Sequence, residues 1–287
     1  PRGSWAVEVY TDPKAAPLAR QTVLFEDFLP ERIDFDQAIR DAQNLVPGGQ
    51  VLVDIDARFL FGAPGAGLAV EGDVTLRPVR ALAEFPGYRF GRYDANVAPL
   101  TSYFGGEETD AEGKALAYGD LPEAEAEGLP LEARLRTRLS DGSGRPVERE
   151  VTAPVRPATP IIGLKPMFEE DQVREGSEAS FQLIALGSDL APAPMKVQWV
   201  LNRVETRYQW YQLYGDWQWE PITRRSRVTS GEATLGGDPV TVSAAVDWGR
   251  YELVVERLDG DYVAASEDFY AGWYVPASDA QTPDRLE

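Results

Sequence analysis

The residues of this sequence that could do chemistry are its carboxylates, because the chain contains no His and no Cys. Without imidazole or thiol it has no Ser-His-Asp triad, no thiol nucleophile and no zinc site built from His and Cys. Paired Asp and Glu side chains could still hydrolyse a glycosidic bond, and their oxygen atoms could still bind Ca2+. No Glu is marked by its surroundings as unusually buried. We therefore expect no enzyme, no cofactor and no bound metal.

Two acidic groups are the candidates for a calcium site. Neither has the ligand spacing of an EF-hand loop, and solvated acidic loops are common in a chain with 47 Asp plus Glu against 28 Lys plus Arg. We interpret both groups as solvated and the stretch 105–127 as long loops. The two groups are Glu107, Glu108, Asp110 and Glu112, and then Glu123, Glu125 and Glu127.

The formal charge of -19 excludes an unassisted nucleic-acid binder, which needs basic residues to displace phosphate counterions. Against this acidic background, Arg224 and Arg225, with Arg227, form the densest basic spot. Two interpretations remain open. The arginines could bind an acidic patch of a neighbouring domain, or they could lie on a solvated strand edge.

Six of the seven tryptophans lie from Trp199 onward, and Trp210, Trp217 and Trp219 lie close together around the turn Gly215-Asp216. One hypothesis is an aromatic platform for a sugar ring or a partner protein. The other, which the period of two favours, is that these rings fill a sandwich core and its hairpin edge.

The elements that must position these residues are almost all strands. Residues 51–59 alternate, with apolar side chains on one face and charged ones on the other, as a half-buried antiparallel strand requires. Residues 36–44 are the only plausible helical turn. Short β-prone runs separated by turn residues recur along the rest of the chain. We predict an all-β fold of tandem antiparallel β-sandwich domains, immunoglobulin-like or fibronectin-like in style.

We predict four parts. Residues 1–34 form a hairpin, the end of a preceding domain, plus a linker; residues 35–155 and 156–275 form two sandwiches; residues 276–287 begin the next domain or form a tail. Pro154, Pro157 and Pro160 mark the central boundary. The chain begins with Pro1 rather than Met, and we expect it to be a piece of a longer protein.

Several ordered segments carry a resemblance to a known family. Phe25–Ile33 resembles the strand-to-linker junction between macroglobulin-like domains of the bacterial branch of the alpha-2-macroglobulin family, and Ala57–Leu68 resembles the aromatic, Gly-Pro-containing strand and turn that follows it. Further similar segments occur in family order, so that the resemblance covers residues 5–275. These are Thr109–Gly113, Gly144–Val147, Ile162–Pro166, Tyr208–Tyr211 and Trp248–Tyr251.

The resemblance implies a scaffold fragment of a broad-spectrum protease inhibitor. Such a protein encloses a protease sterically after its bait segment is cut, and a thioester in a Cys-x-Glu-Gln motif can capture the protease covalently. This chain has no Cys, so the resemblance assigns it no reactive residue. Small polar interdomain surfaces would permit rearrangement. The implied location is the periplasm, as an inner-membrane-anchored lipoprotein; the implied partners are target proteases, neighbouring domains and a penicillin-binding protein of cell-wall synthesis.

A rival hypothesis belongs to another class of protein. Tandem sandwiches could form a surface protein that binds carbohydrate or cell wall through the Trp-rich second domain. Loss of sugar binding in Trp217→Ala or Trp219→Ala would favour it.

Overall fold

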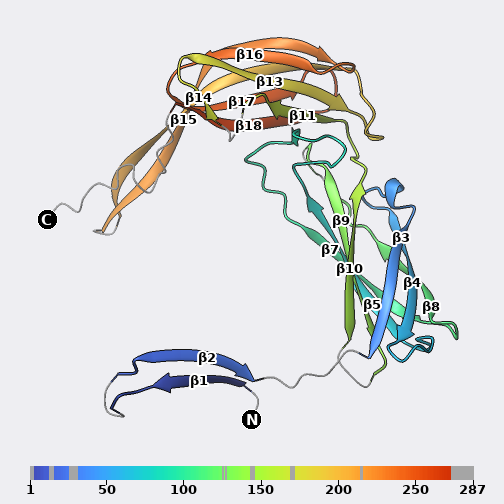
Figure 1. The fold of residues 1–287 in the computed structure, drawn as a ribbon. Coiled ribbons are helices and arrows are strands. Elements are labelled where there is room, and N and C mark those ends of the chain that lie inside the picture. Colours follow the sequence, from blue (N-terminus) through green and yellow to red (C-terminus); the bar gives the residue numbers. More distant parts are fainter. Residues whose placement is uncertain are drawn as a thin grey trace.

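The computed structural model describes residues 3–12, 16–25, 32–124, 126, 128–142, 146–168, 172–213 and 216–272. Within these ranges the chain is built almost wholly of antiparallel strands, which confirms the predicted all-β fold class (Figure 1). No helix in this part of the chain is long and apolar enough to cross a bilayer. The predicted tail, residues 276–287, lies outside the described residues.

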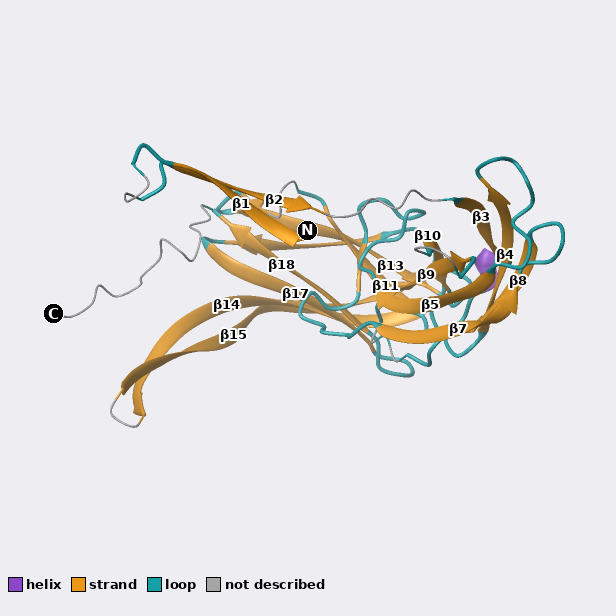
Figure 2. Cartoon of the chain, turned by 90° about the horizontal axis from the view of Figure 1, so that it is seen from below, coloured by secondary structure: helices purple, strands orange, loops and turns teal. Residues whose placement is uncertain are grey.

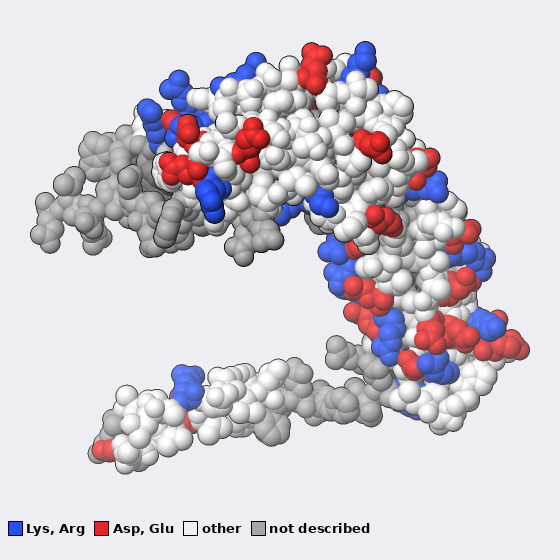
Figure 3. Space-filling view, turned by 45° about the horizontal axis from the view of Figure 1, so that its top comes forward, with Lys and Arg blue, Asp and Glu red and all other residues white. Residues whose placement is uncertain are grey.

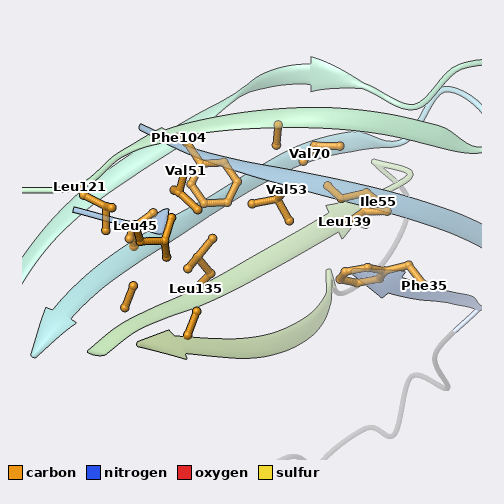
Figure 4. Close-up of a cluster of buried hydrophobic side chains, with 14 of the residues drawn as sticks. Phe35, Leu45, Val51, Val53, Ile55, Val70, Phe104, Leu121, Leu135 and Leu139 are labelled. Carbon is orange, nitrogen blue, oxygen red and sulfur yellow. The ribbon is translucent and has the colours of Figure 1, made fainter. Parts of the chain in front are cut away.

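The first sandwich, residues 33–155, packs a sheet of order β3-β4-β8 against one of order β10-β9-β5-β7. In β4 the predicted alternation is confirmed, because Val51, Val53, Ile55 and Ala57 are all buried. Figure 4 shows such apolar side chains between the strands of this domain. The strands are β3 (Ile33–Arg40), β4 (Gln50–Phe59), β5 (Ala69–Pro78), β7 (Leu100–Glu108), β8 (Lys114–Asp120), β9 (Leu131–Ser140) and β10 (Val147–Val155).

Two local predictions in this domain were wrong. Residues 36–40 belong to strand β3, and only Ala42–Asn44 form a turn of 3-10 helix, because Ile33 and Phe35 alternate into the core and β3 pairs with β4 along its length. The stretch 105–127 is not a long loop, since it contains the end of β7 and all of β8. Of its carboxylates, Glu107 and Glu108 lie on β7 and Asp120 on β8, whereas Asp110 and Glu112 lie in the turn between these strands.

The second sandwich, residues 161–271, packs a sheet of order β16-β13-β11-β6 against one of order β12-β18-β17-β14-β15. Phe181, Val255 and Phe269 are among the fully buried side chains of its own core cluster. Its strands are β11 (Ile161–Pro166), β12 (Gln172–Val173), β13 (Ser177–Leu186), β14 (Met195–Leu213), β15 (Asp216–Leu235), β16 (Val240–Val246), β17 (Gly249–Arg257) and β18 (Ala264–Ala271).

The two sandwiches meet end to side, and β14 and β15 project beyond the rest of their sheet (Figure 2). The first sandwich ends with β10 at Val155, and the second begins with β11 at Ile161. The boundary drawn from the prolines falls between these strands. One strand does not respect that boundary: β6 (Arg89–Phe90) precedes it in the chain and belongs to a sheet of the second sandwich.

The predicted N-terminal hairpin is present as β1 (Gly3–Val9) and β2 (Ala19–Phe25), paired antiparallel along their full lengths. Its apolar side chains are exposed, with Trp5 at 47% and Val7 at 56%. Residues 26–31, which lead to β3, are outside the described residues. The assignment of this hairpin to a preceding domain stays a prediction.

Candidate functional site at the junction of the two sandwiches

The connection between β5 and β7, residues 79–99, leaves the first sandwich and builds part of the second. Its strand β6 pairs antiparallel with β11, with Phe90 opposite Gly163 and Arg89 opposite Leu164. Close approach at this point depends on Gly163, because a Cβ there would lie 2.9 Å from the ring of Phe90. The first half of the chain thus supplies an edge strand to the second.

Behind β6 lies a small apolar core shared by the two domains. Phe90 is fully buried and meets Leu82 from the same connection and Ile161 and Leu186 from the second sandwich. Phe85 packs edge-on against Phe90, with ring centroids 6.3 Å apart. The interdomain surface is therefore apolar at its centre, which corrects the expectation of a small polar surface between the sandwiches.

One carboxylate of the second sandwich, Glu267 on β18, is bound by two arginines of the connection, Arg80 and Arg89. Arg80 binds its Oε2 at 2.7 Å and also donates to the carbonyl oxygen of Ser266 at 3.0 Å, and Arg89 binds the other carboxylate oxygen. The side chain of Glu267 is only 4% exposed. A carboxylate at this depth is tolerated because two guanidinium groups neutralise it.

A second buried carboxylate, Glu252 on β17, lies beneath residues 91–94 of the connection. The hydroxyl of Tyr93 donates to Glu252 at 2.8 Å, Arg225 donates from Nε at 3.0 Å, and Asn202 donates at 3.3 Å. Backbone contacts fix the loop beside it, because the amide of Tyr93 donates to the hydroxyl of Ser266 at 3.1 Å. Three side chains from two domains thus donate hydrogen bonds to Glu252.

The pKa shifts of Tyr93, Arg225 and Asp94 favour fixed hydrogen bonds at the junction over proton transfer. Burial, followed by the hydrogen bond to Glu252, raises the pKa of Tyr93 above 10.0, so that its hydroxyl stays a donor at neutral pH. Hydrogen bonds to Glu252 and Tyr93 raise the pKa of Arg225. The hydrogen bond from Arg92 lowers the pKa of Asp94 below its ordinary 3.8. The junction can therefore hold the two domains together through fixed hydrogen bonds.

Comparison with known proteins shows which family uses these two domains. Residues 31–157 match the bacterial alpha-2-macroglobulin MG5 domain, and residues 163–273 match the bacterial macroglobulin domain 6. The chain belongs to the bacterial alpha-2-macroglobulin family. This confirms the resemblance seen in the sequence. Strand β6 lies inside the MG5 match and pairs inside the sheet of domain 6.

Individual alpha-2-macroglobulins are similar over nearly the whole chain. The protein of Xylella fastidiosa strain Temecula1 is 29% identical over 289 residues, and that of Escherichia coli K12 is 27% identical over 286 residues. These matches cover 95% and 91% of this chain but 17% of each relative. The chain thus spans 17% of the length of these relatives.

Solved structures agree with the sequence relatives. The structure of Salmonella alpha-2-macroglobulin reacted with methylamine matches with a TM-score of 0.64 and 26% identity, covering 95% of this chain and 18% of that one. The structure of Escherichia coli alpha-2-macroglobulin activated by porcine elastase matches with a TM-score of 0.64 and 25% identity, covering 96% of this chain and 24% of that one.

The tryptophans singled out in this alpha-2-macroglobulin chain lie on the projecting part of β14 and β15. Trp219 is 56% exposed, and its backbone lies directly opposite that of Trp210; Trp217 lies opposite Gln212. The side chains of Trp210 and Trp217 are outside the described residues. The choice between a core role and a binding platform for the three rings stays a prediction.

The two arginines of the basic spot have different surroundings. Arg225 joins the junction, where it binds Glu252 and also lies 3.9 Å from Asp94 of the first sandwich. Arg224 is exposed and lies opposite Glu205 on the other face of the ribbon.

The acidic groups considered for calcium are spread over strands and turns. Asp110 accepts hydrogen bonds from the backbone amides of Glu112 at 3.0 Å and Lys114 at 2.7 Å, which is the role of a turn-forming side chain. Among the residues that the structure describes, no three Asp or Glu side chains are grouped closely enough to hold a metal ion. Glu125 and Glu127 lie outside that set.

Proposed function

We propose that this chain is part of the rigid body of a longer bacterial alpha-2-macroglobulin, an extracytoplasmic, lipid-anchored inhibitor that encloses proteases sterically after its bait segment is cut. The chain itself contributes shape and no catalysis. The observation that carries the proposal is the insertion of β6 into the second sandwich. Membership of the family supports the trapping role of the longer protein.

The contacts at the junction favour one rigid unit over two hinged ones. Separating the sandwiches would expose Phe90, remove the edge strand beside β11 and leave Glu267 without Arg80 and Arg89. Leaving a buried charge without its partner costs about 3 to 5 kcal/mol. We therefore place the rearrangement that follows bait cleavage at other joints of the longer protein.

The partners in this proposal are the target proteases and the other domains of the longer protein. The relatives and structures reported above give no support for a penicillin-binding protein as a partner. Carbohydrate binding remains the competing function, with the exposed Trp219 as its basis.

The first experiment compares the chain with the longer protein that contains it. Each is mixed with a protease, and cleavage of a large protein substrate and of a small peptide substrate is measured. The longer protein is expected to slow only the large substrate, because an enclosed protease still admits peptides. The 287-residue chain is expected to slow neither. Strong inhibition by the chain alone would contradict the proposal, and so would saturable binding of peptidoglycan fragments with no trapping by the longer protein.

The second experiment locks the junction. The double variant Tyr93→Cys with Ser266→Cys places two thiols where the amide of Tyr93 now donates to the hydroxyl of Ser266. If the sandwiches move as one body, the oxidised longer protein is expected to trap proteases with the same efficiency as its reduced form. The reduced form is the matched control. Loss of trapping on oxidation, with recovery on reduction, would show that the junction has to open.

A further inference from the structure

The projecting part of β14 and β15 is a two-stranded ribbon without a sheet behind it. β17 pairs with β14 only from Val197 to Val204. Beyond Val204 the described part of β14 pairs with β15 alone, over nine residues to Leu213, a length of about 30 Å at the usual rise of a strand. We call residues 205–213 and 216–224 the arm. Figure 2 shows it extending past the other strands of its sheet.

The register of the arm separates its residues into two faces. Trp219 lies opposite Trp210, Pro221 opposite Tyr208 and Trp217 opposite Gln212, and directly opposed residues share a face. We call this the aromatic face. By the same register the other face carries mostly charged and polar residues, together with Tyr211, Leu213 and Ile222, of which Ile222 is 46% exposed. The charged and polar residues are Glu205, Arg207, Gln209, Asp216, Gln218, Glu220 and Arg224.

The aromatic face continues a surface that is already an interface. By the same register it runs down the ribbon to Val204 and Arg225, which lie opposite each other at the base of the arm. Arg225 binds Glu252 there, and Tyr93 of the first sandwich covers Glu252 from outside. Val204 is 5% exposed, whereas Trp219 is 56% exposed. This face of the sheet is thus covered at the junction, whereas Trp219, farther along the arm, is largely exposed.

We propose that the aromatic face of the arm packs against a further domain of the same longer polypeptide, on the face of the sheet where the first sandwich already binds. The inference rests on the proposed function, because it needs a longer protein. An isolated two-stranded ribbon is marginally stable in water, and aromatic side chains are the residues most often anchoring an interface. The relatives supply the chain needed for such a partner, since this chain spans 17% of their length.

The experiment is hydroxyl-radical footprinting of the 287-residue chain and of the longer protein that contains it. Trp219 is expected to be oxidised several-fold more slowly in the longer protein. Ile222, on the opposite face of the same ribbon, is the internal control and is expected to react at similar rates in both. Equal oxidation of Trp219 in the two proteins would overturn the inference.

The other occupants of the face give different results. Protection of Trp219 in the 287-residue chain that grows with protein concentration would indicate a second copy, and protection on addition of soluble peptidoglycan fragments would indicate a glycan; either would overturn the inference. The matched variants are Trp219→Glu and Ile222→Glu. In the longer protein, only Trp219→Glu is expected to accelerate hydrogen exchange along residues 205–224 several-fold. Protease trapping by the longer protein is measured in a separate assay. A longer protein that does not trap proteases can then be distinguished from one in which the arm is exposed.

Discussion

Two sets of ion pairs in this molecule use the same side chains at different depths. On the outer face of the first sandwich, Arg134 pairs with Glu150 at 2.5 Å, and both side chains are 39% exposed. At the junction, Arg80 pairs with Glu267 at 2.7 Å, with exposures of 36% and 4%. The arginines are equally accessible, so the carboxylate makes the difference. Water solvates Glu150 whether or not it is paired, whereas Glu267 depends on its arginines.

The outer pairs form a ladder that leaves acids and bases interleaved over the surface of the first sandwich, as Figure 3 shows. Such a ladder keeps neighbouring strands in register and keeps the surface soluble. The number of ion pairs therefore does not indicate which of them hold the two domains together.

The largest effect is expected from removing both arginines at the buried carboxylate. Arg80→Met with Arg89→Met leaves Glu267 at 4% exposure with neither guanidinium group. The free energy of unfolding is expected to fall by about 3 to 5 kcal/mol. Urea unfolding followed by tryptophan fluorescence measures it.

The matched control is Arg134→Met with Arg136→Met, whose side chains are 39% and 37% exposed and whose partners are exposed carboxylates. A much smaller loss than that of the junction variant is expected for this pair of changes, because water solvates the exposed partners. Equal losses in the two double variants would contradict the comparison. Adding Glu267→Leu to the junction variant is expected to restore part of the stability, because it removes the stranded charge.

A smaller effect is expected from pH. The hydrogen bond from Arg92 lowers the pKa of Asp94 below 3.8, so the ionised form is favoured in the folded state. The stability that this contributes is fully present above the unfolded pKa and is lost as the pH falls through the lowered folded pKa. Asp94→Asn lacks this contribution at every pH. The stability difference between the native chain and the variant is expected to be constant near neutrality and to shrink below about pH 4.

Unfolding midpoints measured from about pH 6 to about pH 2 test this expectation. Asp54→Asn is the comparison variant, since the hydrogen bond from Arg40 also lowers the pKa of Asp54 and both side chains of that pair are about half exposed. A stability difference between the native chain and Asp94→Asn that does not change with pH would show that the hydrogen bond from Arg92 to Asp94 does not stabilise the folded state.

The smallest effect is expected from a single change in the outer ladder. Arg134→Ala removes one exposed pair and is expected to lower the free energy of unfolding less than any variant above, with the loss reduced further in high salt by screening. Urea unfolding at low and high salt measures both parts. A loss in the free energy of unfolding as large as that of the junction variant would show that an exposed pair stabilises the protein as much as a buried carboxylate does.

The core of each sandwich was readable from the sequence, but its charged strands were not. The pattern of residues 51–59 predicts a strand because apolar side chains alternate with charged ones. Strand β8 and the end of β7 were not predicted because the stretch that contains them is polar and Gly-rich, as loops often are. The long strands of the projecting ribbon, β14 and β15, did not follow from the short β-prone runs that the sequence shows, since β14 runs unbroken from Met195 to Leu213.

The junction could not be predicted because its residues are brought together from distant parts of the chain. Arg80 lies 187 positions from Glu267, and Tyr93 lies 159 positions from Glu252. A signal was present nonetheless: the connection 79–99 carries Leu82, Phe85 and Phe90, more large apolar residues than a solvated loop needs. Nothing local shows which surface those residues cover.

The position of β6 has a consequence for how such proteins can evolve. Strand β6 is encoded within the gene segment of the first sandwich. A duplication or transfer that carried only residues 161–271 would therefore leave the edge of β11 without its partner strand. It would also leave the buried Glu267 without Arg80 and Arg89. We therefore expect recombination to preserve the pair of sandwiches as one unit.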